Sequence, residues 1–589
     1  MNVRRDILDH IFRILILILS LIFFHKIIFA TEYVLIHGDY RYALTVEQHI
    51  QYHLNKIFIH APKLPFLFVL YLMKIAFGDI LAEKFFTVYI LFLSTSLIYS
   101  SNKYFLNKIF DKHDGKILIS ALIGAIGFIY NPWTINKIHH HYWLVLSIAS
   151  SYCLLAKIDN FVHNSSHIDK KIFQILLISS LIVSIAVQVQ ALILYTIPML
   201  GLYVSCFLLF EKSRFLVKLS NKKLIFVFFI TLLLNLFWIL PQLIVLTSGV
   251  TKPGGYGIVV ENVDTLSRRS SFLNVLTATN MFIWGGRGSV NYKLVINGID
   301  VWRIFSFLPV ILSSISILII PRICTSRDAK CYFTYFVILF ILSIVLSTGS
   351  YYPVIGDAYR WVFLKTSLGW AIRDPYKNTG LIVISINILI TTLVFVIIEK
   401  IKGLNAFKIA LVLSIIWIVV TWGWPALTGD LNGHLRQSLV KYPEDLEKTI
   451  EYLKDDSNCV NNILWYPPKI DSVYFVYHDV PEISSSNLNL IDLENEGLTK
   501  YMENILKNDC KKEVLCLLSR LGVKYVILRQ DLLESSQSSR LLKDIKAFEL
   551  LFEDSRKIKF GDFTVYAVSY THLRAHETSL HLVCRLLLE

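Results

Sequence analysis

Charged residues are scarce in this chain of 589 residues: 17% are Asp, Glu, Lys or Arg, whereas average soluble domains carry about 25%. Long apolar runs are abundant instead. Those at residues 14–24 and 224–240 approach the ~20 residues that a membrane-spanning helix needs. A soluble core would not require so many of them. The composition therefore excludes an ordinary soluble protein and predicts a polytopic, α-helical membrane protein.

Several enzyme motifs are also missing. The chain contains no GxSxG, no HExxH and no GxxxxGK[ST] sequence. Its eight cysteines form no CxxC pair. These absences argue against a nucleotide-driven pump, a hydrolase of the soluble type and a structural zinc site.

Acidic residues are fewer than basic residues, 44 against 58, so the formal net charge is +14. The basic residues lie mostly in short loops between apolar runs, which is the positive-inside pattern; it sets membrane orientation and predicts no nucleic-acid partner. Arg4, Arg5 and Arg13 precede the first run, so the N-terminus is expected to be cytoplasmic. The other loops predicted to be cytoplasmic are residues 103–116, 157–171, 212–223, 322–330 and 400–408.

The predicted transmembrane region extends over residues 1–424. About 11 crossings are expected, and 12 or 13 are left open by two apolar stretches at residues 65–77 and 85–98. Loop charges require an odd number of crossings there, so one stretch is expected to be short, interfacial or part of a broken helix. The segments predicted to be external are residues 31–63, 131–141, the short turn at 188–190, 248–302 and 349–378.

After residue 424 the chain changes character. Residues 425–567 have mixed polarity and include the strand-like segments VKYVILR, AFELLFED and FTVYAV, so we predict a soluble extracytoplasmic α/β domain. Residues 568–589 break abruptly from this pattern and resemble a translated adapter sequence. We expect them to be non-native, and their His572, His576, His581 and Cys584 are discounted as a metal cluster.

The segment HGDYRY follows the first apolar run and contains Asp39, Tyr40 and Arg41. A carboxylate at the membrane surface can take a proton from an acceptor while a lipid-borne donor lies in the bilayer beside it. Partial burial would raise the pKa of such a group toward the working range of a general base. The alternative is that Asp39 only caps a helix at the interface.

Three successive histidines, His139, His140 and His141, lie in the next predicted external turn, NPWTINKIHHHYW. Adjacent side chains on a helix point about 100° apart, so the three cannot all bind one metal ion. One or two are candidates for joining Asp39 as ligands or for contacting a phosphate. The alternative is that these amphipathic rings lie in the headgroup zone.

A further pair of cations, Arg373 and Lys377, lies in SLGWAIRDPYKNTG, immediately before an apolar run. Cations on a predicted external face depart from the positive-inside trend. Arg offers a planar fork to phosphate oxygens and Lys a point charge. Arg360 in DAYRW is a weaker candidate for the same anionic partner. The alternative is a structural ion pair between Arg373 and Asp374.

The order of these features resembles the GT-C superfamily of integral membrane glycosyltransferases. The likeness is carried by the early Asp in HGDY, by the turn YNPWTINKIHHHYWLVL and by IRDPYKN, and it spans nearly all of residues 1–567. These segments look like those of prokaryotic arabinofuranosyltransferase-like proteins and of membrane proteins that glycosylate cell-surface polymers. The resemblance implies a multi-span body followed by an external C-terminal domain.

The resemblance also implies a function. GT-C enzymes take sugars from polyprenyl-phosphate carriers, and Asp39 matches their acidic residue in the first external loop. The expected reaction is an inverting transfer to an external glycan, lipid or protein, with Asp39 as base. Arg373, with Lys377, Arg360 or a histidine of the 139–141 run, would hold the donor phosphate. The alternatives are a non-catalytic protein that binds or translocates a polyprenyl-linked lipid, and a structural subunit of an envelope complex.

The resemblance bears on the cofactor, and residue usage bears on the location. Many GT-C enzymes carry a second acidic residue in the first loop, whereas Glu47 is the nearby candidate here, so a requirement for a divalent cation is left open. Frequent Lys, Ile and Asn indicate an AT-rich prokaryotic genome. The plasma membrane of a prokaryote is therefore the expected location.

Overall fold

The computed structural model divides the chain into two compact units. Unit 1 comprises Met1–Ala30, His37–Asp39 and Lys56–Arg436, and unit 2 comprises Thr31–Ile36, Tyr40–Asn55 and Gln437–Glu589. The structure describes residues 2–31, 33–35, 46–55, 60–112, 114–138, 141–163, 168–219, 222–247, 267, 270–279, 292, 295–296, 299–324, 326–351, 353–366, 369–372, 374–401, 408, 412, 422–433, 439–441, 445, 448–449, 452–453, 462–466, 518, 523–529, 549, 552–553 and 555–567.

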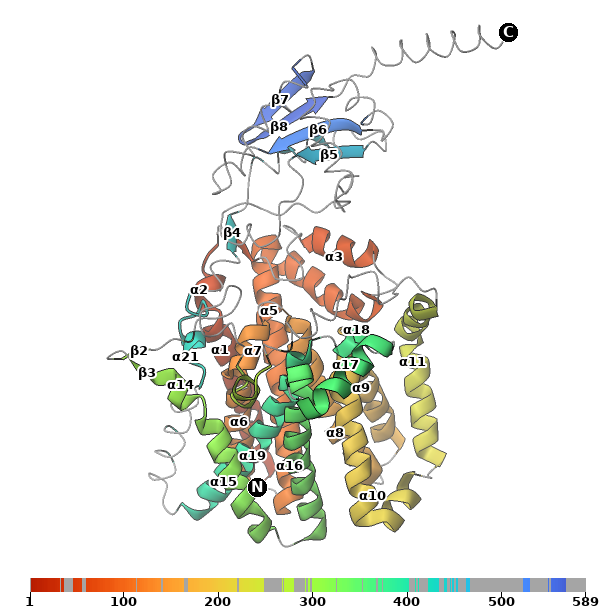
Figure 1. The fold of residues 1–589 in the computed structure, drawn as a ribbon, viewed down its shortest axis with the longest axis vertical. Helices are drawn as coiled ribbons and strands as arrows, with labels where there is room; N and C mark the ends of the chain where they lie inside the picture. The colour runs from red at the N-terminus through yellow and green to blue at the C-terminus, as the bar shows by residue number, and fades with distance from the viewer. Residues whose placement is uncertain are drawn as a thin grey trace. The chain divides into compact units, whose positions relative to one another are not determined.

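Unit 1 is predominantly helical (Figure 1). Its helices up to residue 247 are α1 (Asn2–Phe23), α2 (His25–Ile28), η2 (Ala61–Lys63), α5 (Leu64–Phe110), α6 (Gly115–Ile129), α7 (Pro132–Ile138), α8 (Tyr142–His163), α9 (Ile168–Ala186), η3 (Leu192–Thr196), α10 (Ile197–Leu219) and α11 (Lys222–Thr247). The later elements are α13 (Phe272–Leu276), β2 (Val295–Ile296), β3 (Ile299–Asp300), α14 (Val301–Phe305), α15 (Leu308–Ile323), α16 (Arg327–Thr348), η6 (Gly349–Tyr351), α17 (Pro353–Lys365), α18 (Gly369–Ile372), η7 (Pro375–Asn378), α19 (Thr379–Lys400) and α21 (Trp424–Leu427).

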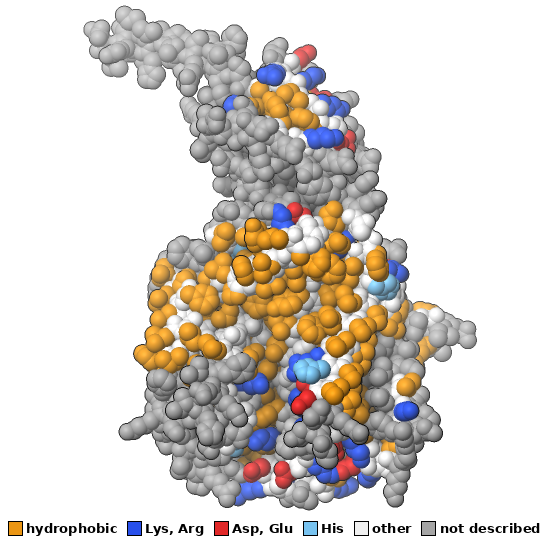
Figure 2. All heavy atoms as spheres, turned by 180° about the vertical axis from the view of Figure 1, so that it is seen from behind, with side chains coloured by type: hydrophobic (Ala, Val, Ile, Leu, Met, Phe, Trp, Pro, Cys, Tyr) orange, Lys and Arg blue, Asp and Glu red, His pale blue; other side chains and the backbone are white. Residues whose placement is uncertain are grey.

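The described helices confirm the prediction of a polytopic α-helical membrane protein. Five of them are long and apolar enough to cross a membrane, or six if α6 and α7, bent by 56°, are counted as one span. Shorter apolar helices cover Gln174–Ala186, Phe229–Ile244 and Leu308–Ile323. Large hydrophobic side chains cover much of the face of unit 1 seen in Figure 2, as expected for a surface in contact with lipid. The count of 11 to 13 spans stays a prediction.

The two apolar stretches near residues 64–100 form one broken helix. Helix α5 extends from Leu64 to Phe110, but Gly78 has φ +75° and ψ 171°, which interrupts the helical backbone. Non-glycine residues rarely adopt this conformation. In the arm before Gly78, Phe68 and Ile75 are largely exposed. A broken helix is one of the arrangements that the sequence left open for this region, whereas the number of crossings stays a prediction.

Several predicted loops contain helix. Residues 349–378 form η6, α17, α18 and η7 in their described part, and α8 continues through residues 157–163 of a predicted cytoplasmic loop. Helix α8 continues into the predicted loop because of contacts with other helices. Asp159 is fully buried and receives hydrogen bonds from neighbouring helices, so a polar residue that indicates a loop in sequence lies inside the bundle.

The buried Asp159 joins four long helices at one carboxylate. Tyr332 of α16 donates to both oxygens, at 2.9 and 2.8 Å, and Tyr104 of α5 and Tyr203 of α10 also donate to it. His163, one turn later in α8, places Nδ1 3.1 Å from Asp159 Oδ1. Buried carboxylates require such partners because desolvation of an isolated charge is costly. We call these five residues the Asp159 cluster.

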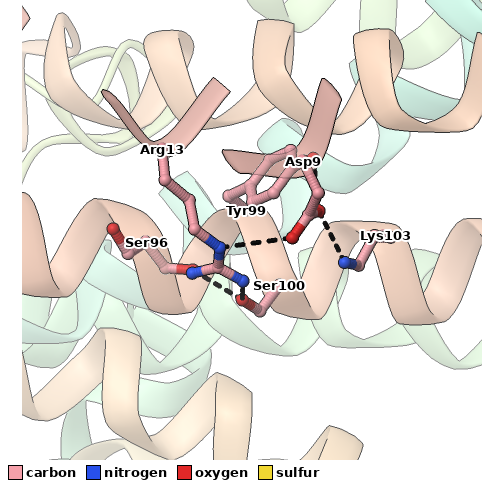
Figure 3. A network of polar contacts seen from close by, with 6 residues as sticks. All are labelled: Asp9, Arg13, Ser96, Tyr99, Ser100 and Lys103. Carbon is pink, nitrogen blue, oxygen red and sulfur yellow. Dashed lines mark hydrogen bonds and ion pairs between the residues drawn. The ribbon is translucent and has the colours of Figure 1, made fainter. Parts of the chain in front are cut away.

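The N-terminal helix is attached to α5 by a polar network (Figure 3). Asp9 of α1 lies 2.7 Å from Lys103 Nζ and accepts a hydrogen bond from Tyr99 at 2.9 Å. Arg13 bonds Asp9 at 3.3 Å and donates to Ser100 Oγ at 3.1 Å. Burial opposes the charge of Asp9, but Lys103, Tyr99 and Arg13 outweigh it and lower the pKa of the carboxyl below 3.8. Asp9 is therefore charged in the folded protein.

Acid is expected to remove this attachment. Because the folded-state pKa of Asp9 is lowered, its stabilisation is present above pH 3.8 and is lost as the pH falls through the lower folded value. We predict that Asp9→Asn lowers the thermal midpoint at pH 7 and that the difference from the wild type shrinks toward pH 3. Melting curves of both proteins in detergent measure this. An equal difference at both pH values would contradict it.

Unit 2 contains a four-stranded sheet of order β5-β6-β8-β7 (Figure 1). The pair β5–β6 is parallel and the other two pairs are antiparallel, as in a mixed α/β sheet. VKYVILR and most of FTVYAV form strands as predicted, whereas the described residues of AFELLFED include a turn at Phe552 and Glu553. The elements of this unit are β1 (Tyr33–Leu35), α3 (Val46–Asn55), β4 (Leu439–Lys441), β5 (Asn462–Tyr466), β6 (Val523–Arg529), β7 (Arg556–Phe560) and β8 (Phe563–Ala567).

Segments distant in sequence meet in this unit. Strand β1 pairs antiparallel with β4, with Val34 opposite Val440. The first predicted external loop is thereby joined to the region after residue 436. The predicted boundary at residue 424/425 and the extracytoplasmic location of this domain stay predictions.

Candidate functional site

Three of the nine predicted site residues lie in the part of the chain that the structure describes: His141, Arg360 and Lys377. The other six lie outside the described residues: Asp39, Tyr40, Arg41, His139, His140 and Arg373. Of these three residues, Lys377 is the most deeply buried.

Lys377 lies in η7, the short helix directly before α19. Its side chain is only 7% exposed, and Nζ donates to Gln190 Oε1 at 3.1 Å. Its backbone carbonyl accepts a hydrogen bond from Tyr195 at 2.8 Å. An ammonium ion in such surroundings pays a large desolvation cost, which hydrogen bonds offset only in part. Cations buried among the helices of membrane proteins commonly mark substrate or ion sites.

Local geometry fixes the position of η7. Pro375 begins this turn, where its missing N–H costs no hydrogen bond. Gly349 lies beside it with φ +57°, and a Cβ there would come within 2.6 Å of Pro375 Cγ, so the turn requires glycine. Asn378 donates to the carbonyl of Leu346 at 3.1 Å, and Tyr376 to that of Ala278 at 3.3 Å.

A second buried cation, Lys137, belongs to the same region. Its Nζ lies 5.2 Å from the ring centroid of Tyr376, within the range of a cation–π interaction, and the side chain is 8% exposed. Asn131 positions α7 by accepting a hydrogen bond from the backbone N–H of Thr134 at 2.9 Å. We call Lys137, Gln190, Tyr195, Tyr376 and Lys377 the Lys377 cluster.

Asp374 supplies negative charge next to this cluster. Among the described residues its Oδ1 is a buried atom with no hydrogen-bond partner. Burial, and secondarily the charge of Asp374, raises the pKa of Tyr359 in α17, so this phenol stays protonated. Tyr359 donates to the carbonyl of Ile372. Arg373 lies outside the described residues, so the structural ion pair between Arg373 and Asp374 stays a prediction.

The other two described candidates have different surroundings. Arg360 is 3.0 Å from Asp357 on the same helix, where both side chains are exposed. Such an exposed pair contributes little to stability and leaves the guanidinium accessible. His141 is half-buried, and its backbone N–H donates to the carbonyl of Lys137 at 2.7 Å. Their roles in phosphate binding stay predictions.

Sequence reasoning did not identify Lys137, Gln190 or Tyr195 as site residues. Lys137 lies inside the quoted NPWTINKIHHH turn, and Gln190 inside the predicted external turn at residues 188–190. Their proximity to residues 375–378 depends on contacts between helices far apart in the chain. Only the external location of both turns was available as a signal.

The chemistry of the Lys377 cluster favours an anion. The two ammonium groups can donate charge-assisted hydrogen bonds to phosphate or carboxylate oxygens. Among the described residues no group of three or more His, Cys, Asp and Glu could hold a metal ion. The described part of the site thus places two buried ammonium groups near the start of an apolar helix.

Comparisons with known proteins support the predicted fold. No protein-family model and no curated protein sequence matches the chain. The structure is similar to the cryo-EM structure of the arabinofuranosyltransferase AftD from mycobacteria, with a TM-score of 0.55 and 11% identity over 95% of this chain. The chain spans 40% of the length of that protein. The chain therefore shares its fold with that arabinofuranosyltransferase, in agreement with the multi-span architecture that the sequence resemblance implied.

A second similarity is to the archaeal oligosaccharyltransferase AglB from Archaeoglobus fulgidus, solved with an inhibitory peptide and a dolichol-phosphate. Here the TM-score is 0.42 and the identity 10%, over 95% of this chain and 74% of AglB. At 11% identity the similarity to AftD concerns the fold alone, and nothing further follows from the similarity to AglB.

Proposed function

We propose that this chain is a membrane glycosyltransferase that transfers a sugar from a polyprenyl-phosphate donor to an extracytoplasmic glycan, lipid or protein. The observation that carries the proposal is the buried ammonium of Lys377 at the start of α19, within a fold shared with a membrane arabinofuranosyltransferase. The proposed location is the plasma membrane of a prokaryote.

The Lys377 cluster would bind the phosphate of the donor. When the glycosidic bond to phosphate breaks, negative charge grows on the leaving oxygen. Lys377, and Lys137 nearby, are in place before the reaction, so they stabilise this charge without reorganisation. The desolvation cost that both cations pay is offset once an anion binds. Arg373, Arg360, His139, His140 and His141 are proposed to contact the donor from the adjoining turns.

Asp39 would act on the acceptor. As a base it removes the proton of the acceptor hydroxyl, whose oxygen then attacks the anomeric carbon in line and inverts it. The sugar–phosphate bond breaks, and the electron pair leaves on the polyprenyl phosphate. Tyr40 and Arg41 are proposed to position donor and acceptor at the membrane surface. This step needs no metal ion, although a divalent cation is compatible with it.

The role of Lys377 is tested by donor binding. Lys377→Gln removes the charge, but the new side chain can still bond Gln190. We expect the affinity for radiolabelled polyprenyl-phosphate hexoses or pentoses to fall about tenfold to 100-fold. Hydrogen bonds to charged groups contribute about 1.5–3 kcal/mol, which corresponds to this loss. The exposed Lys365 of α17 provides the matched control Lys365→Gln, which should bind as the wild type does. Unchanged affinity in folded Lys377→Gln protein would reject the phosphate site.

A further inference from the structure

We propose that His49 and His53 form a binding site for a transition-metal ion such as Zn²⁺ on α3. The two Nε2 atoms are 3.2 Å apart, and the ring centroids are 5.0 Å apart. Both residues belong to one helix of unit 2 and are separated by four positions. The proposal does not depend on the function proposed above, because it uses none of the residues assigned there.

The distance between the nitrogens is that expected of two imidazoles on one ion. With Zn–N bonds of about 2.0–2.1 Å, two ligand nitrogens lie about 2.9 Å apart at a 90° angle and about 3.3 Å apart at the tetrahedral angle. The observed 3.2 Å falls between these limits. A spacing of four residues on a helix produces this geometry, because side chains at i and i+4 share one face. The same two-histidine spacing occurs in helical zinc motifs.

The burial of the pair points the same way. Val46, His49 and His53 are 0, 2 and 0% exposed, so they form the buried face of α3. Buried faces of short helices are normally apolar, since a polar group there is costly unless it is bonded. The two Nε2 atoms face each other within hydrogen-bond distance. A metal ion would engage both Nε2 lone pairs at once.

The ligand chemistry restricts the choice of ion. Imidazole suits Zn²⁺, Co²⁺, Ni²⁺ and Cu²⁺, whereas Mg²⁺ and Ca²⁺ prefer oxygen ligands. Two histidines fill half of a tetrahedral shell, and water or another oxygen donor would complete it. The ion would hold adjacent turns of α3 together. This pair is distinct from the histidine run at residues 139–141 that the sequence suggested as ligands.

The test requires a background free of other metal-binding histidines. The full chain is purified on a tag without histidine. Two histidine-rich segments are also replaced, because each could bind metal without α3: His139, His140, His141, His572, His576 and His581 become Ala, and Cys584 becomes Ser. Zn²⁺ binding is measured by competition with a chelating dye, and bound metal by elemental analysis. We expect one ion per chain.

Matched variants identify the ligands. His49→Gln and His53→Gln should each lower the Zn²⁺ affinity at least tenfold, the scale on which even outer partners of metal ligands act. His10→Gln replaces an exposed histidine on α1 and should change nothing. Binding should weaken in acid, because protons compete for the imidazole nitrogens. Equal binding by the background protein and the double His49→Gln, His53→Gln variant would overturn the proposal.

A spectroscopic measurement on the unsubstituted pair covers the case in which these buried variants do not fold. Cu²⁺ added to the background protein should give an electron paramagnetic resonance spectrum with hyperfine coupling to two nitrogens. Co²⁺ should give the visible absorption of a low-symmetry site. If folded protein with one equivalent of metal gives neither signal, His49 and His53 form only a hydrogen bond and the proposal is overturned.

Discussion

Asp39→Asn is expected to lower the rate of sugar release about 10²–10⁴-fold, the usual contribution of a general base, while the donor still binds. Asn has nearly the same size as Asp but cannot accept a proton from the acceptor hydroxyl. Donor affinity should persist, because the phosphate contacts are assigned to Lys377 and its neighbours. The measurement uses purified protein in nanodiscs with radiolabelled polyprenyl-phosphate sugars, and scores both donor binding and release of free polyprenyl phosphate.

Glu47 provides the control for this experiment. It is the other acidic residue near Asp39 in the first predicted external loop, and the proposed mechanism gives it no role. Glu47→Gln should therefore keep both binding and turnover. Donor binding by the wild type and by Asp39→Asn without turnover with any acceptor would favour a carrier or translocation protein over an enzyme. Equal loss in both variants would indicate that the loop folds incorrectly.

Asp159→Ala is expected to reduce the free energy of unfolding by about 3–5 kcal/mol, the scale for removing one partner from a buried charged network. The substitution leaves Tyr104, Tyr203, Tyr332 and His163 without the carboxylate that all four contact. These residues belong to α5, α8, α10 and α16, so the loss loosens four helices at once. Stabilities of native proteins are about 5–15 kcal/mol, and the variant should therefore be obtained in low yield.

Two milder variants separate the charge from the geometry of this cluster. Asp159→Asn keeps one acceptor oxygen and should cost less than Asp159→Ala. Tyr104→Phe removes one hydrogen bond to a charged group and should cost about 1.5–3 kcal/mol. Denaturant titrations in mixed micelles rank the three proteins. If Asp159→Ala is as stable as Tyr104→Phe, the carboxylate does not organise the bundle.

Part of the candidate site was accessible from sequence because of charge alone. Lys377 was selected as a cation on a predicted external segment, and the structure places it in a buried, hydrogen-bonded position. Its partner Gln190 is 187 positions away, and hydropathy and loop charge carry no information about which turns meet. The His49–His53 spacing was visible in the sequence, but burial and the nitrogen distance distinguish it from an ordinary surface pair.

Composition alone indicated the membrane character, because transfer of a segment into lipid depends on that segment's own side chains. From short motifs, the sequence also implied the multi-span architecture by its resemblance to GT-C glycosyltransferases. It also located two strands of the C-terminal sheet through their local apolar pattern. Only the tertiary structure placed the helix break at Gly78, moved Asp159 from a predicted loop into the core, and joined Lys137, Gln190 and Lys377 around η7. These features depend on which distant helices pack together and satisfy each other's polar groups, and such contacts leave no periodic trace along the chain.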